Sequence, residues 1–469
     1  MGDKPEPLHR TWINSNRFVP TTFVSPVRRF MALESASGLL MLLAAIAAVI
    51  WANSGAHETY ESLLHTDFLI EVGPFRLEET LGHLINDGLM ALFFFVVGLE
   101  IKRALVLGEL KNPKDATLPV LAALGGMLTP ALIYVAFTAG DPDALRGWAI
   151  PVATDIAFAL GVLSLLGRRV PPAAKMFLLA LAIVDDLGGI LVIALFYTSD
   201  LDVPAIGLAL VGLGVVWLLT RIGIRSEVIY IPIGFAVWYL FLVSGVHATL
   251  AGVALGFLTP ARPMYGVREF DTRARKILDI FPASADTHAD RERADHEAFL
   301  LAQVSRESIA PLNRWEHTLT PWVSFLVVPL FALANAGVRF EGSILDHLLS
   351  NVALGVGFGL VIGKVVGITA FSWLAVRLGL SRLPAGTDWR QMFGVAATAG
   401  IGFTVALFIT ALAFDDPVLT DAAKVGIFAG SIISGMIGVS VFVFGSRRQA
   451  VPASDNGHHG VEEEARSTT

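Results

Sequence analysis

The chain consists largely of apolar stretches that are long enough, or nearly long enough, to cross a lipid bilayer as helices. About 20 predominantly apolar residues span the hydrocarbon core. Twelve such stretches follow one another, at about 36–52, 84–99, 117–139, 148–166, 173–197, 203–222, 228–243, 245–260, 319–337, 351–376, 392–414 and 423–445. Only 16% of the 469 residues are charged, whereas soluble domains carry about 25%. This pattern predicts an all-α polytopic membrane protein with 12 transmembrane helices.

The same pattern divides the chain into tails, helices and a linker. The expected order is a cytoplasmic tail over 1–35, transmembrane helices 1–8 over 36–260, a cytoplasmic linker over 261–318, helices 9–12 over 319–446 and a disordered cytoplasmic tail over 447–469. A helix is expected around 293–308 within the linker. The short stretches 228–243 and 245–260 form either two tilted helices or a hairpin. The chain has no cysteine, which excludes disulfides and thiolate metal sites.

Lysine and arginine residues sort onto one side of the predicted membrane protein. Nearly all of the 34 basic residues lie in the tails and in every second connection, while the other connections hold only Arg76, Arg146 and Arg339. Because positively charged loops remain on the cytoplasmic side, both termini are predicted to be cytoplasmic. Nothing in this distribution supports binding to nucleic acid.

Four ionisable residues lie well inside the apolar stretches: Asp155, Asp185, Asp186 and Lys364. A charge at bilayer depth costs roughly 2.5–3.5 kcal/mol even on lenient scales, so such residues usually mark function. Burial and a neighbouring like charge both favour the protonated form of a carboxyl group. An ionised carboxylate, in turn, offers the oxygen ligands that hard cations prefer. The adjacent aspartates therefore indicate exchange of a proton for a cation.

Helix-breaking residues interrupt two of the stretches. Pro151 lies four residues before Asp155, and Gly394, Gly400 and Gly402 interrupt the eleventh stretch. Each interrupted stretch is the middle member of a unit of three, and the charge distribution starts the two units on opposite sides of the membrane. Interrupted spans at matching places in two halves indicate the binding site of a transporter built from inverted repeats.

Several motifs occur together in the chain. They are Asn86-Asp-Gly-Leu-Met, Val97-Gly-Leu-Glu-Ile-Lys-Arg, Ala153-Thr-Asp-Ile-Ala-Phe-Ala, Asp185-Asp-Leu-Gly, Ser244-Gly-Val-His-Ala-Thr-Leu-Ala-Gly, Pro329-Leu-Phe-Ala-Leu-Ala-Asn-Ala-Gly and Gly400-Ile-Gly-Phe-Thr. On these motifs the sequence resembles the NhaA-type sodium/proton antiporters of bacteria, over about 31–261 and 312–446. That family is itself an established example of inverted repeats with a site at the membrane midplane.

The resemblance implies twelve helices, with the fourth and eleventh broken and crossing at the midplane. It also implies an electrogenic, pH-activated sodium (or lithium)/proton antiporter of the bacterial inner membrane that works by alternating access. Asp185 and Asp186 would bind the ion and carry protons. Thr154 and Asp155 would lie at the crossing, where Asp155 offsets the positive half-helix ends. Lys364 would offset the negative ends or pair with Asp185.

A pH-sensing cluster at the cytoplasmic ends of the helices is also implied by the resemblance. Its members would be Glu100, Arg103, Glu316 and His317. The chain departs from the family pattern at Ala104, where a second carboxylate is expected, and at Thr320, where a second histidine is expected. His247 matches a family histidine near the outer end of the eighth span and is a further candidate for the pH response. The simpler interpretation of His247 is a packed, hydrogen-bonded side chain.

Rival functions fit the residues less well. A membrane enzyme that binds magnesium and a prenyl diphosphate needs further acidic and basic residues, but Leu-Gly-Gly-Ile follows the two aspartates. A passive cation channel would place its charges in a ring rather than on interrupted helices. We therefore expect a transporter and not an enzyme, with no cofactor and with sodium or lithium and protons as cargo. The choice between monovalent cations, the proton-to-ion ratio and the choice between monomer and homodimer remain open.

Overall fold

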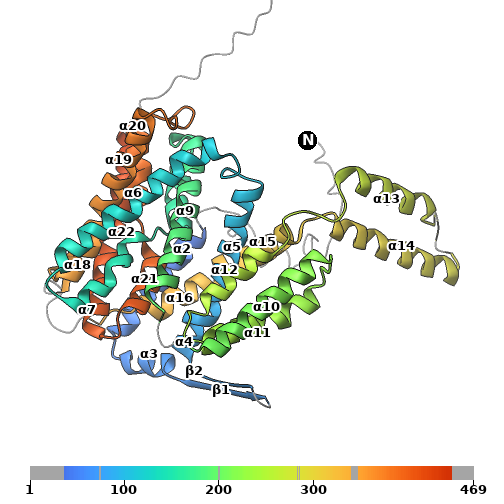
Figure 1. Ribbon diagram of the computed structural model, residues 1–469, viewed down its shortest axis with the longest axis horizontal. Coiled ribbons are helices and arrows are strands. Elements are labelled where there is room, and N and C mark those ends of the chain that lie inside the picture. The colour runs from blue at the N-terminus through green and yellow to red at the C-terminus, as the bar shows by residue number, and fades with distance from the viewer. Residues whose placement is uncertain are drawn as a thin grey trace, which may run out of the picture.

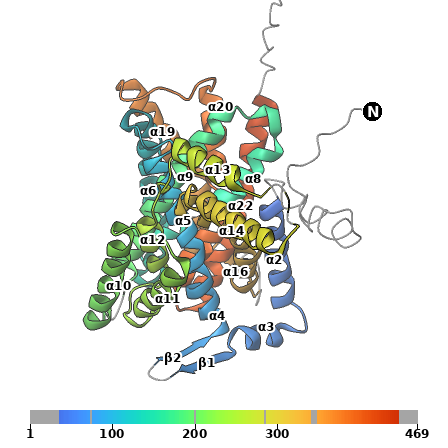
Figure 2. The ribbon, with the colours of Figure 1, turned by 90° about the vertical axis from the view of Figure 1, so that its right-hand side faces the viewer.

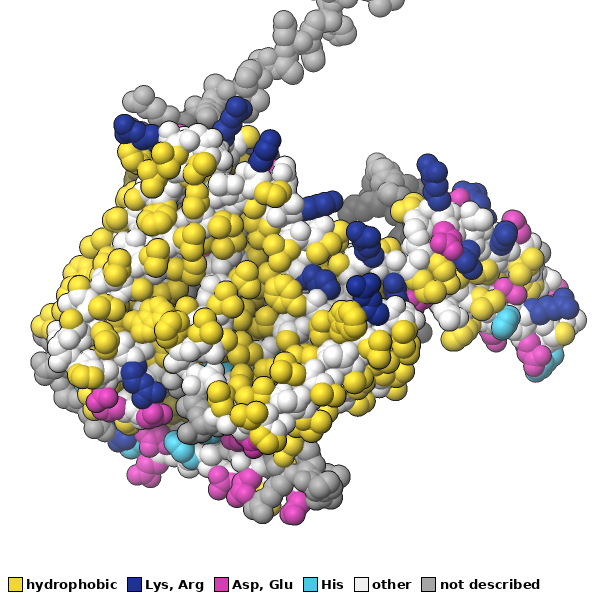
Figure 3. All heavy atoms as spheres, in the orientation of Figure 1, with side chains coloured by type: hydrophobic (Ala, Val, Ile, Leu, Met, Phe, Trp, Pro, Cys, Tyr) yellow, Lys and Arg dark blue, Asp and Glu magenta, His cyan; other side chains and the backbone are white. Residues whose placement is uncertain are grey.

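The computed structural model describes residues 36–72, 75–198, 201–282, 284, 286–339 and 347–445, and this part of the chain is mostly helical (Figure 1). The expected tails, 1–35 and 447–469, lie outside the described residues. An apolar surface covers the body of the molecule in Figure 3, with basic side chains along its upper margin and acidic side chains at its lower end. The face shown there therefore has the apolar band and the two differently charged ends that are typical of a membrane protein.

Six helices of the described chain are long and apolar enough to cross a membrane. They are α6 (Pro113–Thr138), α9 (Pro172–Phe196), α10 (Val203–Arg221), the continuous helix Pro311–Asn335, the continuous helix Asn351–Arg377 and α22 (Pro417–Gly445). Three bent pairs of helices bring the number to as many as nine. Two shorter apolar helices, α11 (Glu227–Val243) and α12 (Thr249–Leu258), occupy the two short stretches, and α5 is Met90–Val106. The expected total of twelve spans stays a prediction.

Two of the continuous helices contain π-helical turns. Pro311–Asn335 is made of α15 (Pro311–Trp322), the turn η6 (Val323–Val327) and α16 (Val328–Asn335). Asn351–Arg377 is made of α18 (Asn351–Phe358), the turn η7 (Gly359–Gly363) and α19 (Lys364–Arg377). A third π-helical turn, η3 (Leu84–Leu89), follows the single turn α4 (Leu81–His83) and leads into α5. Such turns often occur at functional sites, and Lys364 directly follows one of them.

Both interrupted stretches are broken helices. The first runs through α7 (Pro142–Leu145) and the 3₁₀-helix η4 (Arg146–Val152), breaks, and resumes as α8 (Ile156–Leu165) with a bend of 44°. The second consists of α20 (Trp389–Thr398) and α21 (Phe403–Ala413), bent by 46°.

The positions of the breaks follow from the local sequence. Pro151 ends the regular hydrogen bonding of η4 just before the first break. Gly400 and Gly402 lie in the second break, as expected, but Gly394 is inside α20. There it allows close packing against Phe442, so it does not interrupt the helix.

The broken helices lie within two packed groups. One group is α6, η4–α8 and α9, and the other is α18–α19, α20–α21 and α22. The groups interlock because α6 packs along α18 and α19, and because α21 packs against η4. A tightly packed six-helix unit therefore surrounds both breaks, and α2, α5 and α16 pack around it (Figure 1).

Two features of the connections were not anticipated. α2 (Ala36–Ala52) turns by 115° into α3 (His57–Leu64), and a two-stranded antiparallel hairpin follows, β1 (Asp67–Val72) with β2 (Phe75–Thr80). The linker holds α13 (Val267–Ile280) as well as α14 (His288–Glu307), which covers the helix expected around 293–308. In Figure 2 the hairpin lies at the opposite end of the body from α20.

Candidate functional site

The two helix breaks contact each other directly. The backbone N–H of Asp155 donates to the Ile401 carbonyl over 2.7 Å, and the Thr154 hydroxyl lies 2.8 Å from the Ala399 carbonyl oxygen. Asp155 and Thr154 belong to the break before α8, whereas Ile401 and Ala399 belong to the break between α20 and α21. Backbone groups that the breaks would leave unpaired are thus satisfied by the other broken helix.

The Asp155 carboxylate caps two helix N-termini at once. Its Oδ1 accepts a hydrogen bond from the Phe158 N–H of α8 over 2.9 Å. Its Oδ2 accepts from the backbone N–H of Thr404 over 3.1 Å and from the Thr404 hydroxyl over 2.6 Å, both at the start of α21. A helix N-terminus carries about half a positive charge. One buried carboxylate therefore meets the positive ends of both half-helices.

Lys364 and Asp185 form a fully buried ion pair. The Lys364 Nζ atom lies 2.5 Å from Asp185 Oδ2, and neither side chain is exposed. The Thr154 hydroxyl lies 2.8 Å from the same Asp185 oxygen. Because a hydroxyl has one proton, Thr154 donates either to Asp185 or to the Ala399 carbonyl at any moment. Of the two partners that the sequence left open for Lys364, the structure places it against Asp185.

Asp186 is next to Asp185 on α9 but has a different environment. Neighbouring helix residues point about 100° apart, so the two carboxylates face different sides of α9. Asp186 is 7% exposed and takes part in no hydrogen bond or ion pair within the described chain. The second oxygen of Asp185, Oδ1, is buried and has no hydrogen-bond partner there either. Carboxylate oxygens that lack donors are suited to hold either a proton or a cation.

Acidic groups dominate the surroundings of Asp186. The charges that act most strongly on it are those of Asp185, Glu100 and Asp155, against the single ammonium of Lys364. A buried region with more carboxyl groups than cations attracts protons and small cations. It does not suit an anionic substrate.

The structure brings together three of the four residues of the expected pH-sensing cluster, near the C-terminal end of α5. Arg103 Nη1 lies 2.5 Å from Glu316 Oε1 of α15. Glu100, one turn before Arg103, lies within electrostatic reach of both side chains. His317 is exposed and is not part of these contacts. The Thr320 hydroxyl donates to the Glu316 carbonyl over 2.7 Å.

His247 lies in the connection between α11 and α12, close to the end of α9. Its Nε2 atom is 2.7 Å from the Tyr197 carbonyl oxygen, so Nε2 carries a proton and donates. The Tyr197 hydroxyl in turn donates to the Arg146 carbonyl over 2.6 Å. This environment matches a packed, hydrogen-bonded histidine.

Two polar residues near these sites stand in the quoted motifs, but the sequence analysis assigned no role to either. The Thr404 side chain supplies Asp155 with a hydroxyl donor. The Lys102 ammonium contacts the carbonyls of Phe257, at 2.7 Å, and Thr259, at 2.5 Å, at the C-terminus of α12. Lys102 stands in the same motif as Glu100 and Arg103, and this position was the one feature of the sequence that could have drawn attention to it. Its partners lie about 155 residues away, so the sequence could not name them.

Comparisons with known proteins show which proteins the chain is similar to. The family described as Na+/H+ antiporter 1 matches residues 28–442. A protein of Sorangium cellulosum named Na(+)/H(+) antiporter NhaA 2 is 46% identical over 432 residues, which cover 92% of each chain. A protein of the same name from Pseudomonas syringae pv. syringae is 48% identical, covering 88% of this chain and 94% of its own. One from Erythrobacter litoralis is 42% identical, covering 92% and 98%.

Proposed function

The chain belongs to the Na+/H+ antiporter family, and on that basis we propose that it expels sodium from the cell in exchange for protons. As a multi-pass protein of the bacterial inner membrane with both termini in the cytoplasm, it uses the inward proton gradient to drive sodium out. The two interlocked three-helix groups act as inverted repeats around the crossing.

The observation that carries the proposal is the buried aspartate pair beside the crossing. Asp186 has no partner in the described chain, and Asp185 has one free oxygen. The same oxygens bind sodium when ionised and lose it when protonated. Protons and sodium therefore compete for one site, and competition at a site that opens to one side at a time produces exchange.

Lys364 takes part in this competition as a built-in cation. Its ammonium occupies Asp185 Oδ2 in the structure. Sodium that binds between the two aspartates meets the positive charge of Lys364 at short range, so its binding weakens the Lys364–Asp185 pair. When two protons leave the site for each sodium that enters, net charge crosses the membrane and the exchange is electrogenic.

Activity should rise as the medium turns alkaline, for two separate reasons. Protons fill Asp185 and Asp186 in acid, which excludes sodium. In addition, the cluster of Glu100, Arg103 and Glu316 joins α5 to α15, and its titration can bias the conformational equilibrium. Because Ala104 and Thr320 replace two titratable groups, this second contribution should be weaker than in relatives that have them.

Substitution of Asp186 by asparagine tests the proposal. In everted membrane vesicles energised to accumulate protons, a fluorescent pH probe reports proton release when a cation is added. We expect release on addition of sodium or lithium by the unmodified protein and none by Asp186→Asn, because an amide cannot exchange a proton. Asp143→Asn, at an exposed position on α7, is the matched control and should remain active.

The vesicle assay, together with a measurement in proteoliposomes, separates the alternatives. Release with potassium but not with sodium or lithium would assign the protein to another monovalent cation. Cation movement in proteoliposomes without coupled proton movement would indicate a passive channel. Exchange by Asp186→Asn at the unmodified rate would refute the assignment of the site.

A further inference from the structure

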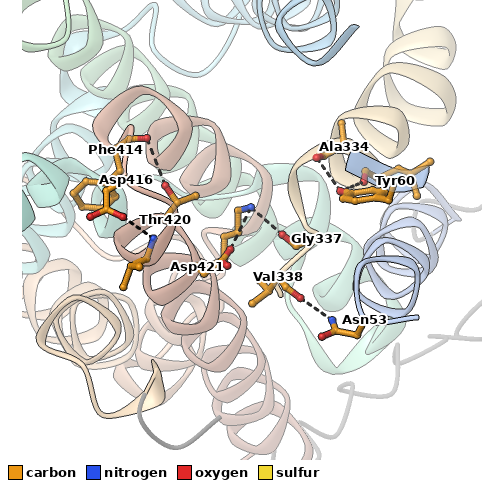
Figure 4. A network of polar contacts seen from close by, with 12 residues as sticks. Asn53, Tyr60, Ala334, Gly337, Val338, Phe414, Asp416, Thr420 and Asp421 are labelled. Carbon is orange, nitrogen blue, oxygen red and sulfur yellow. Dashed lines mark hydrogen bonds and ion pairs between the residues drawn. The ribbon is translucent and has the colours of Figure 1, made fainter. Parts of the chain in front are cut away.

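A polar network joins three parts of the chain at the end of the molecule near α3. Its centre is the segment 336–339, which has no regular secondary structure and directly follows α16. Lys424 of α22 donates to the Gly337 carbonyl over 2.9 Å. Asn53, at the end of α2, donates to the Val338 carbonyl over 2.7 Å. In Figure 4 Asn53 lies against Val338, and Asp421 lies on the opposite side of Gly337.

Tyr60 fixes the start of the same segment. Its hydroxyl lies 2.9 Å from the carbonyl oxygens of both Leu333 and Ala334, in the last turn of α16 (Figure 4). Helix C-terminal carbonyls lack partners within the helix, so the Tyr60 hydroxyl acts as a cap. A Cβ atom on Gly337 would lie 2.7 Å from the Tyr60 ring. The segment is therefore pressed against α3 with no space for a side chain at Gly337.

Lys424 approaches the segment from the other side. Its side chain is only 16% exposed, and its nearest carboxylate oxygen, on Asp421, is 3.8 Å away. The shorter contact is the one to the Gly337 carbonyl. A hydrogen bond from a charged donor is stronger than one between two neutral groups. The position of the buried ammonium is thus set by a backbone carbonyl that belongs to another part of the protein.

This contact connects the six-helix unit with the helices around it. α22 packs with α18 and α20 inside the unit. The segment 336–339 is held instead by α2 and α3, and α16 packs along α2. A movement of α22 away from the segment 336–339 that exceeds the reach of the Lys424 side chain therefore breaks the Lys424–Gly337 hydrogen bond.

We propose that Lys424 is a conformational latch. Its hydrogen bond to Gly337 holds this end of α22 against the α2–α3–α16 group and stabilises the conformation seen here. The alternate conformation of the transport cycle releases it. Asp421, 3.8 Å away, keeps a counter-ion beside the released ammonium. The inference rests on the proposed transport cycle, in which two conformations exchange.

The absence of cysteine from the sequence allows a direct measurement. Glu58→Cys on α3 and Val418→Cys on α22 place spin labels at two exposed positions on either side of the latch. Pulsed electron-spin resonance in lipid nanodiscs then gives the distance distribution between them, with and without saturating sodium. We expect Lys424→Met to raise the population of the alternate conformation, relative to the conformation seen here, by about tenfold or more, as loss of one charged hydrogen bond implies.

Two further variants make the result specific. Gly337→Ala should shift the populations in the same direction, because its methyl group displaces the segment from Tyr60 while Lys424 is retained. Lys276→Met removes an ammonium from an exposed position on α13 and should leave the distances unchanged. Size-exclusion profiles and melting temperatures report whether each variant is folded.

Identical distance distributions in the unmodified, Lys424→Met and Gly337→Ala proteins would overturn the latch. A failure of the proposed function would look different. The vesicle assay would then show no sodium-dependent proton movement by the unmodified protein, whatever the distances between the labels.

Discussion

Asp185 and Asp186 are neighbours in the chain, yet only Asp185 has a cationic partner within the described structure. The Asp185 carboxylate shares Oδ2 with the Lys364 ammonium and the Thr154 hydroxyl. Asp186 is surrounded mainly by other carboxyl groups. Two chemically identical side chains therefore have different electrostatic surroundings: Asp185 has a counter-ion, and Asp186 does not. Asp186 is the member of the pair whose charge must be neutralised by a proton or by an arriving cation.

The Lys364–Asp185 pair should behave as a coupled unit in stability measurements. Lys364→Met leaves a buried carboxylate without its counter-ion, which costs about 3–5 kcal/mol when the charge cannot be solvated. Asp185→Asn combined with Lys364→Met removes both charges and should recover a large part of that loss. Thermal melting of the purified variants in one detergent measures the effect. Losses that simply add in the double variant would show that the two side chains do not stabilise each other.

The stability of Asp155 variants should depend on how many side-chain oxygen acceptors the new residue retains. Asparagine keeps one side-chain oxygen and can cap α8 or α21, but not both. Alanine caps neither. With an N-cap worth about 1 kcal/mol, we expect melting temperatures to fall in the order Asp, Asn, Ala. Thr404→Val, which removes one donor to Asp155 Oδ2, should fall between Asp and Ala. Equal stability of Asn and Ala variants would contradict shared capping.

Gly402 should not tolerate a methyl group. A Cβ atom there would lie 2.9 Å from a Leu360 methyl carbon and 3.0 Å from the Ala153 carbonyl oxygen, at the contact between the two breaks. Overpacking of this kind costs about 1–3 kcal/mol. Gly435→Ala is the control, because its Cβ would meet Ile401 at an ordinary 3.5 Å. We expect Gly402→Ala to lower the melting temperature and the exchange rate, and Gly435→Ala to leave both near the unmodified values.

Saturating sodium should separate the two proposed sources of pH dependence. Competition at Asp185 and Asp186 raises the apparent sodium KM by about tenfold per pH unit in acid for each competing proton. It leaves the maximal rate unchanged. A fall of the maximal rate in acid would indicate that titration of the cluster controls transport. Ala104→Glu should then make that fall steeper.

His317 provides the check on that interpretation. Histidine as an amino acid changes its charge near pH 6.5, roughly in the physiological range, which makes this residue type the natural candidate for a switch near neutral pH. The structure nevertheless leaves His317 exposed, away from the contact between Arg103 and Glu316. If the maximal rate falls in acid and His317→Ala leaves that fall unchanged, His317 is not the residue whose titration lowers the rate. A maximal rate that stays constant with pH would make the cluster structural.

The breaks were predictable because backbone chemistry is local. Pro151 lacks an N–H, and Gly400 and Gly402 offer no side chain to pack within a helix, so their positions mark the interruptions directly. Gly394 is also a glycine in the same apolar stretch, but it lies inside a helix, where Phe442 of α22 packs closely against it. A glycine in the sequence therefore does not by itself distinguish a helix break from a site of close helix packing.

Contacts between distant parts of the chain were not predictable to the same degree. The partner of Lys364 lies 179 residues away, and periodicity alone could not choose between Asp185 and a helix end. Lys424, Asn53 and Tyr60 contact backbone carbonyls, which every residue has. Such contacts leave no residue pattern in the sequence. The β1–β2 hairpin was hidden for a related reason, since its strands are six residues each within an acidic connection.

The double cap formed by Asp155 has a consequence for biosynthesis. Phe158 follows Asp155 almost at once, but Thr404 is 249 residues further along the chain. At the usual 5–20 residues per second, a ribosome needs about 12–50 s to add that length. During this interval the newly inserted first half holds a carboxylate with only one of its two helix ends in place. The half-finished protein must therefore keep this position hydrated or protonated until α21 arrives, so the last helices to be made complete a site that the earlier ones leave open.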